Sequence, residues 1–304
     1  MSLYQNHIGL SFSCSKLQLV EVNYNENSFY LENVDEEYFN EFINLDSKET
    51  QVISILQNAF NELQLRKPIK GKAVSITLPN EFFKIVEIPY EKTLIPNDLK
   101  DMFKWNLSIL YPDLNTDDFV VQHIDIKNGN VGSSAIVIGV NRRYLKALHK
   151  FCVRNNLVLK YIDNAHIASN AYLLKEKISA KDILLSIYVS EKNLSVMLLK
   201  DKKPIYFTSY GFDNIAGTIP IISKSVSAFN KSGISTSSIT SSFIAGENIS
   251  DTLLKQIQET CGLPIVRFNP FNKIKAAPHL IENDNYSYKN NSYSAATGIA
   301  LRII

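Results

Sequence analysis

Residues 8–21 read Ile8-Gly9-Leu10-Ser11-Phe12-Ser13-Cys14-Ser15-Lys16-Leu17-Gln18-Leu19-Val20-Glu21, and they decide the fold. Apolar side chains alternate along the first five positions, and three of the last five, Leu17, Leu19 and Val20, are apolar. Residues 13–16 between them are small or polar. This pattern predicts a β-hairpin over residues 7–22 whose turn lies at residues 13–16.

The segment that follows the hairpin predicts a helix and then a compact α+β unit. Apolar residues at helical spacing over 52–63 indicate an amphipathic helix, with Asp46 or Ser47 as its N-cap and Pro68 as its stop. Residues 72–160 then give the order strand, strand, helix, strand, strand, helix. These elements are expected at 72–78, 82–88, 97–110 with Asn97 as N-cap, 119–126, 134–140 after a turn at 128–130, and 142–155.

The second half of the chain opens with a predicted helix at 164–177 and a three-stranded meander. The pattern of the remaining elements is mixed. They are expected as strands at 183–189, 194–199 and 203–209, a short helix and loop in the Ser-rich stretch 223–242, a strand at 243–245, a helix at 252–261, a strand at 264–268, a polar loop at 279–292 and a helix at 295–301. The single tryptophan, Trp105, is expected to pack in a core.

Composition excludes several classes of function. The 304 residues carry a formal charge of +2 from 32 basic and 30 acidic side chains, which argues against a basic nucleic-acid face. The three cysteines and five histidines show no spacing typical of a zinc site, a disulfide framework or a metal enzyme. No signal peptide and no transmembrane segment is predicted. Glycine, at 11 residues, is about half its usual share, which disfavours phosphate-cradling loops.

Eight stretches, taken in order, carry a resemblance to a known family. They are the hairpin 8–21; Leu78-Pro79 and Ile88-Pro89; Lys104-Trp105 with Tyr111-Pro112; Leu184-Leu185-Ser186-Ile187-Tyr188 with Asn193-Leu194-Ser195; Lys203-Pro204-Ile205-Tyr206-Phe207-Thr208; Phe243-Ile244-Ala245-Gly246; Cys261-Gly262-Leu263-Pro264-Ile265-Val266 with Asn269-Pro270-Phe271; and Ala295-Ala296-Thr297-Gly298-Ile299-Ala300-Leu301-Arg302. Together they resemble the PilM family of type IV pilus assembly proteins, which shares the actin-like ATPase fold with the cell-division protein FtsA.

The resemblance implies an α/β fold of the actin-like type, a duplicated ribonuclease H-like unit with an inserted α+β subdomain. The first actin-like subdomain would span residues 1–71 and be completed by 161–180 and 293–304. The inserted subdomain would span 72–160, and the second actin-like domain 181–292.

The positions that would contact a nucleotide depart from the family's pattern. In the first hairpin the family's Asp is Ser11, its Gly is Ser13 and its Lys is Gln18, while Cys14 and Ser15 stand in the turn. The remaining departures lie in the second half of the chain. The second hairpin has Ser186 for Asp and Tyr188 for Gly, at a position expected in the turn, and the adenosine loop keeps Gly246 but continues with Glu247.

These departures predict a pseudo-ATPase. Metal binding and in-line attack on a phosphate require fixed carboxylates, and small turn residues let the backbone approach the phosphate. We therefore expect no catalytic residue, no metal and no cofactor, with vestigial nucleotide-site positions at Ser11, Ser13, Cys14, Ser15, Gln18, Ser186, Tyr188, Gly246 and Glu247. Weak ATP binding without turnover is left open.

The resemblance implies a cytoplasmic scaffold or adaptor of a type IV pilus or type II secretion-like assembly. Such a protein would lie at the inner membrane by binding the cytoplasmic N-terminal tail of a single-span membrane protein, in a groove between the first subdomain and the inserted unit. Two alternatives remain at this point. One is an ATPase, or a kinase of the same fold, that uses Asp182 or Glu21 as unusual ligands; the other is an FtsA-like protein that self-associates into filaments.

Overall fold

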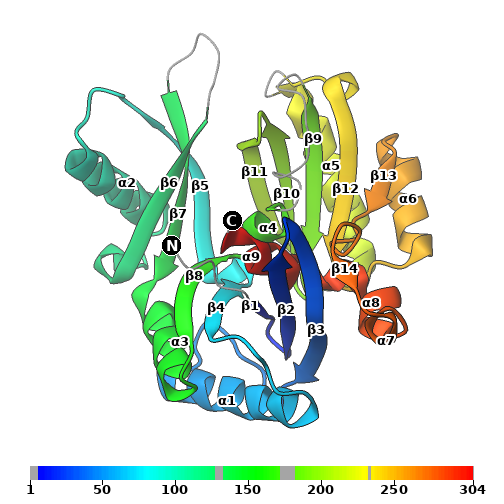
Figure 1. The fold of residues 1–304 in the computed structure, drawn as a ribbon. Helices are drawn as coiled ribbons and strands as arrows, with labels where there is room; N and C mark the ends of the chain where they lie inside the picture. The colour runs from blue at the N-terminus through cyan, green and yellow to red at the C-terminus, as the bar shows by residue number, and fades with distance from the viewer. Residues whose placement is uncertain (1–5, 127–132, 172–181, 232–233, 304) are drawn as a thin grey trace.

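The computed structural model describes residues 6–126, 133–171, 182–231 and 234–303, which form three β-sheets. The predicted turn at 128–130 and most of the predicted helix 164–177 lie outside these residues. The first sheet has the order β14-β3-β2-β1-β4-β8 and runs through the lower half of Figure 1. Its strands are β1 (Asn6–Phe12), β2 (Lys16–Asn25), β3 (Ser28–Tyr38), β4 (Ala73–Leu78), β8 (Val158–Asn164) and β14 (Lys275–Ala276).

The second sheet repeats the strand order of the first. It runs β11-β10-β9-β12-β13, so each sheet places an antiparallel meander beside two parallel strands, in the order third, second, first, fourth, fifth. Its strands are β9 (Ile183–Val189), β10 (Asn193–Lys200), β11 (Lys203–Gly211), β12 (Ile239–Gly246) and β13 (Ile265–Arg267). The repeated order is that of a duplicated ribonuclease H-like unit.

The third sheet belongs to a separate unit at the upper left of Figure 1. Its order is β5-β7-β6, and all its pairs are antiparallel. The strands are β5 (Phe83–Tyr90), β6 (Phe119–Ile126) and β7 (Ser133–Asn141), and α2 (Pro96–Leu110) packs on them through Phe103 and Leu107. The unit therefore spans residues 83–141.

The sheet assignments differ from the boundaries predicted by resemblance. Strand β4 and strand β8 belong to the first sheet, so the inserted unit is shorter than 72–160. Strand β14 pairs with β3, which returns residues 275–276 to the first sheet although 181–292 was expected to form the second domain. The shorter inserted unit follows from strand pairing. Strand β4 pairs parallel with β1 and β8 pairs parallel with β4, so both ends of the predicted segment 72–160 lie in the first sheet.

Helices cover the outer faces of the two large sheets. Helix α1 (Glu49–Arg66) and helix α3 (Arg142–Arg154) share a core with β1, β2 and β4, whereas α5 (Thr218–Lys231) and α6 (Asp251–Cys261) share a core with β9 and β10. The shorter helices are α4 (Ala165–Ser169), α7 (Pro278–Ile281), α8 (Asp284–Ser287) and α9 (Ser294–Ala300), with 3-10 turns at Asn80–Phe82, Thr116–Asp118, Ile215–Gly217, Thr236–Ser238, Asn290–Tyr293 and Leu301–Ile303.

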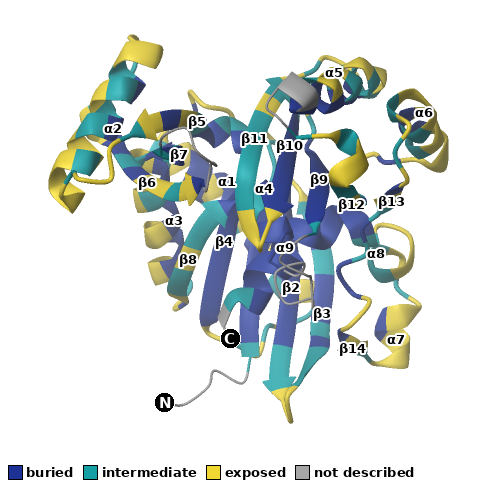
Figure 2. Ribbon diagram, turned by 90° about the horizontal axis from the view of Figure 1, so that it is seen from above, coloured by how far each residue is buried: buried dark blue, intermediate teal, exposed yellow. Residues whose placement is uncertain are grey.

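A third core lies between the two large sheets. Helix α9, red at the centre of Figure 1, packs against β1, β2 and β4. Apolar residues of both sheets meet there, including Val20 and Val22 from the first and Tyr188 and Met197 from the second. Figure 2 shows the central strands of both sheets buried and α2, α6 and α7 carrying much of the exposed surface. The inner faces of the two sheets are thus joined by one apolar core.

Several local expectations need correction. Helix α1 begins after Lys48, and helix α2 after Ile95 with Pro96 as its first residue, so the predicted N-caps Asp46, Ser47 and Asn97 do not have that role. Strand β3 was not predicted, and residues 279–292 contain short helices instead of a loop. Among the described residues, no helix is both long and apolar enough to cross a bilayer.

Candidate functional site

The turns of two hairpins meet between the large sheets. The β1–β2 turn carries Ser13 and Ser15, and the β9–β10 turn carries Glu191. Both serine hydroxyls donate hydrogen bonds to the same Glu191 oxygen, Oε1. The Ser13 hydroxyl oxygen also accepts from the backbone N–H groups of Ser15 and Lys16, at 3.2 Å each. A carboxylate of the chain itself therefore occupies the space between the two turns.

Cys14, the middle residue of the first turn, is not an activated thiol. Its Sγ lies 3.4 Å from Glu81 Oε1. Burial and the nearby Glu81 carboxylate raise the pKa of the Cys14 thiol to about 12, so it stays protonated and a poor nucleophile. Burial likewise raises the pKa of Glu81.

Lys16 begins strand β2 and joins two carboxylates. Its Nζ lies 2.9 Å from Glu36 Oε2 on β3 and 3.0 Å from Glu247 Oε2 just after β12. The side chains of Lys16 and Glu36 are each 5% exposed. Burial alone would lower the pKa of Lys16, but Glu247 and Glu36 raise it above its usual range. Lys289 adds a second cation 2.6 Å from Glu36. Glu247 is thus paired with a cation. The positive charge in this hairpin lies on Lys16 and not on Gln18, which stands at the family's Lys position.

The two positions at which the family has Asp, Ser11 and Ser186, are buried in this chain. Ser11 lies on β1 opposite Gln18, whose Nε2 lies 3.2 Å from Glu36 Oε2 and 3.1 Å from Ser292 Oγ. Ser186 lies on β9, and its hydroxyl lies 3.0 Å from His166 Nε2. These side chains are hydroxyls and an amide, which are weaker ligands for a hard divalent cation than carboxylates are.

His166 and Tyr188 fill the space beside Ser186. The His166 Nδ1 lies 2.8 Å from Ser195 Oγ, and its ring stacks on Tyr188 with the centroids 5.7 Å apart. Burial lowers the pKa of His166 to about 3, so its imidazole is neutral near pH 7. Tyr188 was expected in the turn, but it lies within β9 and is 6% exposed. Its ring therefore packs in the core between the two large sheets.

Gly246 ends β12 where that strand passes close to β9. Its φ of +111° and the position of Val189 require glycine, since a Cβ there would lie 1.9 Å from the Val189 carbonyl oxygen. The Glu247 N–H donates to the same oxygen at 2.8 Å, and Asn291 donates to the Gly246 carbonyl at 2.6 Å. This contact places Glu247 beside Lys16.

A cavity of about 430 Å³ opens beside Glu247. It is lined by the aromatic residues Tyr38 and Tyr288 and by Lys16 and Lys289, whose amine groups both bond to Glu36. The full lining is Lys16, Tyr38, Gly246, Glu247, Asn248, Ile249, Ser250, Tyr288, Lys289, Asn291 and Ser292.

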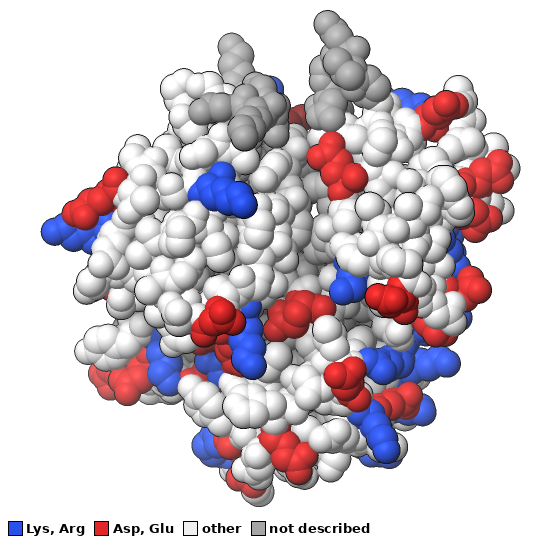
Figure 3. Space-filling view, turned by 180° about the vertical axis from the view of Figure 1, so that it is seen from behind, with Lys and Arg blue, Asp and Glu red and all other residues white. Residues whose placement is uncertain are grey.

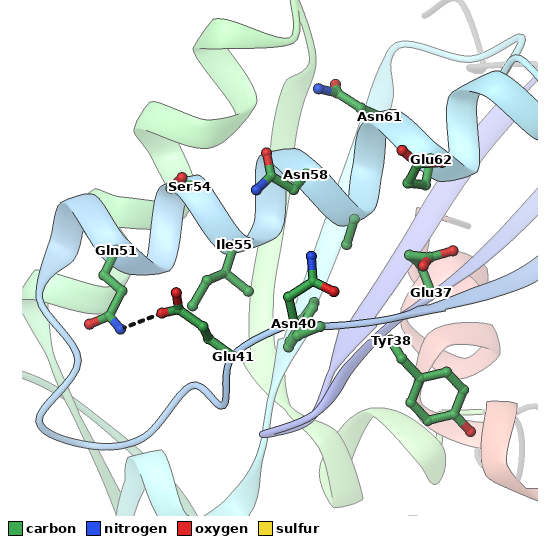
Figure 4. A pocket seen from close by; sticks show the side chains of 12 residues that line it. Glu37, Tyr38, Asn40, Glu41, Gln51, Ser54, Ile55, Asn58, Asn61 and Glu62 are labelled. Atoms are coloured by element: carbon green, nitrogen blue, oxygen red, sulfur yellow. Dashed lines mark hydrogen bonds between the residues drawn. The ribbon is translucent and has the colours of Figure 1, made fainter.

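A second cavity, of about 510 Å³, lies on the outside of the first sheet between helix α1 and the residues that follow β3 (Figure 4). Its lining is mostly acidic and amide side chains, and Gln51 donates to Glu41 across it at 3.1 Å. It contains none of the predicted site residues.

The residues considered for an unusual ATPase lie away from the hairpin turns. Glu21 accepts hydrogen bonds from the backbone N–H groups of Lys70 and Gly71 at 2.9 and 2.7 Å, five residues along β2 from Lys16 and thus about 16 Å from the turn. Asp182 precedes β9 at the end opposite its turn. No cluster of three or more His, Cys, Asp or Glu side chains that could hold a metal occurs in the described part of the chain.

The structure brings most predicted positions together and adds partners that the sequence did not indicate. The hairpin serines, Gly246 and Glu247 meet at one site. Glu191, Glu36, His166 and Lys16 were missed; each is distant in sequence from some of its partners. The charge of Lys16, beside the apolar residues Leu17 and Leu19 of the predicted hairpin, was the one available signal.

Charged side chains are unevenly distributed over the face of the molecule in Figure 3. On the face opposite to that of Figure 1, charged side chains gather over the lower half, and the upper half is largely uncharged around a hollow between its two lobes (Figure 3). Trp105, expected in a core, is 63% exposed on α2, with Ile109 and Leu110 also exposed beside it. The helix packs through its opposite face, which leaves Trp105 outside.

Comparison with known proteins rests on structure alone. No protein-family model and no curated protein sequence matches the chain. A solved PilM–PilN type IV pilus biogenesis complex matches with a TM-score of 0.77 at 15% identity, covering 98% of each chain. A Bacteroides thetaiotaomicron protein of unknown function with an actin-like ATPase fold matches at 0.54, with 12% identity over 88% of this chain and 92% of that one.

A third solved structure comes from a secretion system. The cytoplasmic domain of EpsL, an inner-membrane component of the Vibrio cholerae type II secretion system, matches with a TM-score of 0.50 and 10% identity over 84% of this chain and 94% of that one. The duplicated sheets and the inserted unit agree with these likenesses, and the chain therefore has the actin-like ATPase fold, with the inserted α+β unit, that PilM has.

Proposed function

We propose that this protein is a non-catalytic scaffold of a type IV pilus or type II secretion-like assembly, held at the cytoplasmic face of the inner membrane by the N-terminal tail of a single-span membrane protein. The observation that carries the proposal is the likeness to the PilM of a PilM–PilN complex over 98% of both chains. The EpsL likeness supports the same class of assembly.

The contents of the cleft between the hairpin turns support the absence of ATP hydrolysis. A phosphate between the turns would have to displace the Glu191 carboxylate from Ser13 and Ser15. A metal at Ser186 would meet a neutral imidazole and the Tyr188 ring where a carboxylate is needed. Glu21 and Asp182 lie away from the turns, because Glu21 is five residues along β2 from Lys16 and Asp182 precedes β9 at the end opposite its turn.

Calorimetric titration with magnesium and ATP tests the non-catalytic part of the proposal. We expect no heat of binding up to millimolar nucleotide and no phosphate release. Binding with a dissociation constant below about 10 µM, worth about 7 kcal/mol, would instead mean that the altered loops still form a nucleotide site. ATP hydrolysis that is lost in Asp182→Asn would favour the ATPase alternative.

Peptide binding tests the scaffold part. The probes are synthetic cytoplasmic tails of single-span membrane proteins encoded next to this gene, with scrambled peptides as controls. We expect one tail to bind in the micromolar range while its scrambled form does not. Failure of all such tails to bind the folded protein would exclude the proposed partner class.

A variant pair locates the tail. The carbonyl of Leu45, in the loop after β3, accepts hydrogen bonds from Tyr144 at 2.7 Å and from Arg143, which follow the inserted unit. Phe42 lies on the same loop, three residues before Leu45, and is 69% exposed, so its ring is open to a partner. We expect Phe42→Ser to weaken tail binding by about tenfold, as loss of an aromatic anchor does. Leu65→Ser is the matched control, because Leu65 is 77% exposed near the far end of α1.

A further inference from the structure

The interface between the two halves of the molecule has two layers. At its base, apolar residues of both large sheets and helix α9 form one core, with Tyr293 fully buried in it. Toward the hairpin turns the contacts change to charged and hydroxyl groups: Ser13 and Ser15 bond to Glu191, and Lys16 bonds to Glu247. The base is non-directional, whereas the polar layer requires defined positions of both partners.

The polar contacts join residues that belong to different sheets. Ser13, Ser15 and Lys16 lie on the β1–β2 hairpin of the first sheet. Glu191 and Glu247 follow β9 and β12 of the second. Each bond therefore fixes one half of the molecule against the other and contributes nothing to either sheet alone.

The polar layer is complete in the chain itself. The Glu191 oxygen accepts two hydroxyl donors, and Lys16 is shared by two carboxylates with 5% of its side chain exposed. A charge this well buried would be costly if its partner moved away. Opening the turns would separate Lys16 from Glu247 and leave Glu247 without this cation, while Lys16 would keep Glu36 on the neighbouring strand β3. The closed arrangement is thus favoured by groups that are always present.

We propose that these contacts, Glu191 with Ser13 and Ser15 and Lys16 with Glu247, form an internal latch that holds the two halves closed without a bound ligand. In the actin-like fold the same two turns face a nucleotide; here the Glu191 carboxylate provides the negative charge between them. The placement of the inserted unit beside β11, to which β5 and β6 lie close, is then fixed independently of nucleotide.

Hydrogen exchange of the free protein tests the latch. Three amides report on it: Ser13 N–H to Lys16 O, Ser190 N–H to Asn193 O, and Glu247 N–H to Val189 O. We expect Glu191→Ala to speed exchange about tenfold in peptides covering both hairpin turns, as local opening does. Glu191→Gln keeps an oxygen that can accept from both serines, so it should exchange close to the wild-type rate.

The control variant and the results that would contradict the latch do not depend on the proposed function. Glu32→Ala removes a carboxylate whose partner, Lys70, lies outside the cleft, and should leave both turns unchanged. The latch is wrong if Glu191→Ala changes only its own turn, or if Glu32→Ala has the same effect. If Glu191→Ala does not fold, Ser13→Ala with Ser15→Ala removes the same bonds, and unchanged exchange at Ser190 would overturn the proposal. None of these measurements uses nucleotide or tail peptide.

Discussion

At the scale of single residues, Gly246 lies where strand β12 passes the carbonyl of Val189, and its backbone has a φ of +111°. An added methyl group would overlap that oxygen, so both the space and the conformation oppose substitution. We expect Gly246→Ala to lower the free energy of unfolding by about 3 kcal/mol or more, measured by urea denaturation.

Gly262 is the matched control for Gly246. It also has a positive φ, +65°, but a Cβ there would meet nothing within 4 Å. Gly262→Ala should therefore cost only about 1–2 kcal/mol for the left-handed conformation. Equal losses for the two variants would contradict the close contact with Val189.

His166 predicts an acid sensitivity. Burial places its pKa at about 3 in the folded protein, below the value of 6.5 expected when unfolded. The unfolded chain therefore takes up the proton first as pH falls, and the stabilisation present above pH 6.5 is lost toward pH 3. We expect about 3 kcal/mol of this loss between pH 7 and pH 4.

Two measurements check the role of His166. The ring signals of His166 in proton NMR should stay those of a neutral imidazole down to about pH 4; titration near pH 6.5 would refute the prediction. In chemical denaturation at several pH values, His166→Gln should flatten the loss, while His149→Gln at an exposed position should leave it unchanged.

The sequence located many site residues but few of their partners. Ser13, Ser15, Gly246 and Glu247 were singled out, because each stands at a position that would contact a nucleotide in the family the chain resembles. Their partners could not be found this way, since Glu191 lies 178 residues from Ser13. Trp105 was placed wrongly because its hydrophobicity favours burial, whereas its position on α2 faces outward.

At the scale of elements, the ion pairs of Lys16 join the start of strand β2 to β3 and to the residue after β12. Removing the amine leaves Glu247 without this cation in a largely buried site, where charges without partners are costly. We expect Lys16→Met to lower the free energy of unfolding by about 3–5 kcal/mol. Urea denaturation at pH 7 measures it.

Lys150→Met is the control for Lys16. Lys150 pairs with Glu49 across helices α3 and α1, and its side chain is 59% exposed. Exposed pairs contribute little, so this loss should stay within about 1 kcal/mol. A loss as large as that of Lys16→Met would show that burial is not the cause.

Elements with a clear hydrophobic period were predicted, and those held by distant partners were not. The β1–β2 hairpin and helix α1 follow directly from their apolar spacing. Strand β3 was not predicted because residues 35–37 are all acidic, which is untypical of strands. Its acidic positions are matched by Arg66, which bonds to Asp35 and Glu37, and by Lys16.

At the scale of the whole molecule, one core spans both large sheets. Because residues of each sheet pack around α9, neither half can unfold without exposing apolar surface of the other. We expect a single calorimetric transition whose calorimetric and van't Hoff enthalpies agree.

The core variant Tyr293→Ala tests this cooperativity. Tyr293 is fully buried in the shared core, so its truncation should lower the midpoint of the whole transition and not split it. Phe229→Ala removes a residue of equal burial from the core outside the second sheet. Two resolved transitions in the wild-type protein would show that the halves are independent.

The architecture was predicted through the resemblance, but the boundaries of the inserted unit were not predicted. Nothing in the composition near residue 72 marks the point where β4 leaves the inserted segment for the first sheet. That assignment depends on its parallel pairing with β1, more than sixty residues earlier. Strand pairing over such separations is not visible in local periodicity.

The outward position of Trp105 gives the protein a built-in optical reporter. It is the only tryptophan in the chain, so all indole fluorescence comes from one side of helix α2. Water around the ring should place its emission at long wavelength and leave it open to quenching by iodide. A partner that covers α2 would shift the emission to the blue and protect it, while one that binds only at the hairpin turns would leave the spectrum as it is.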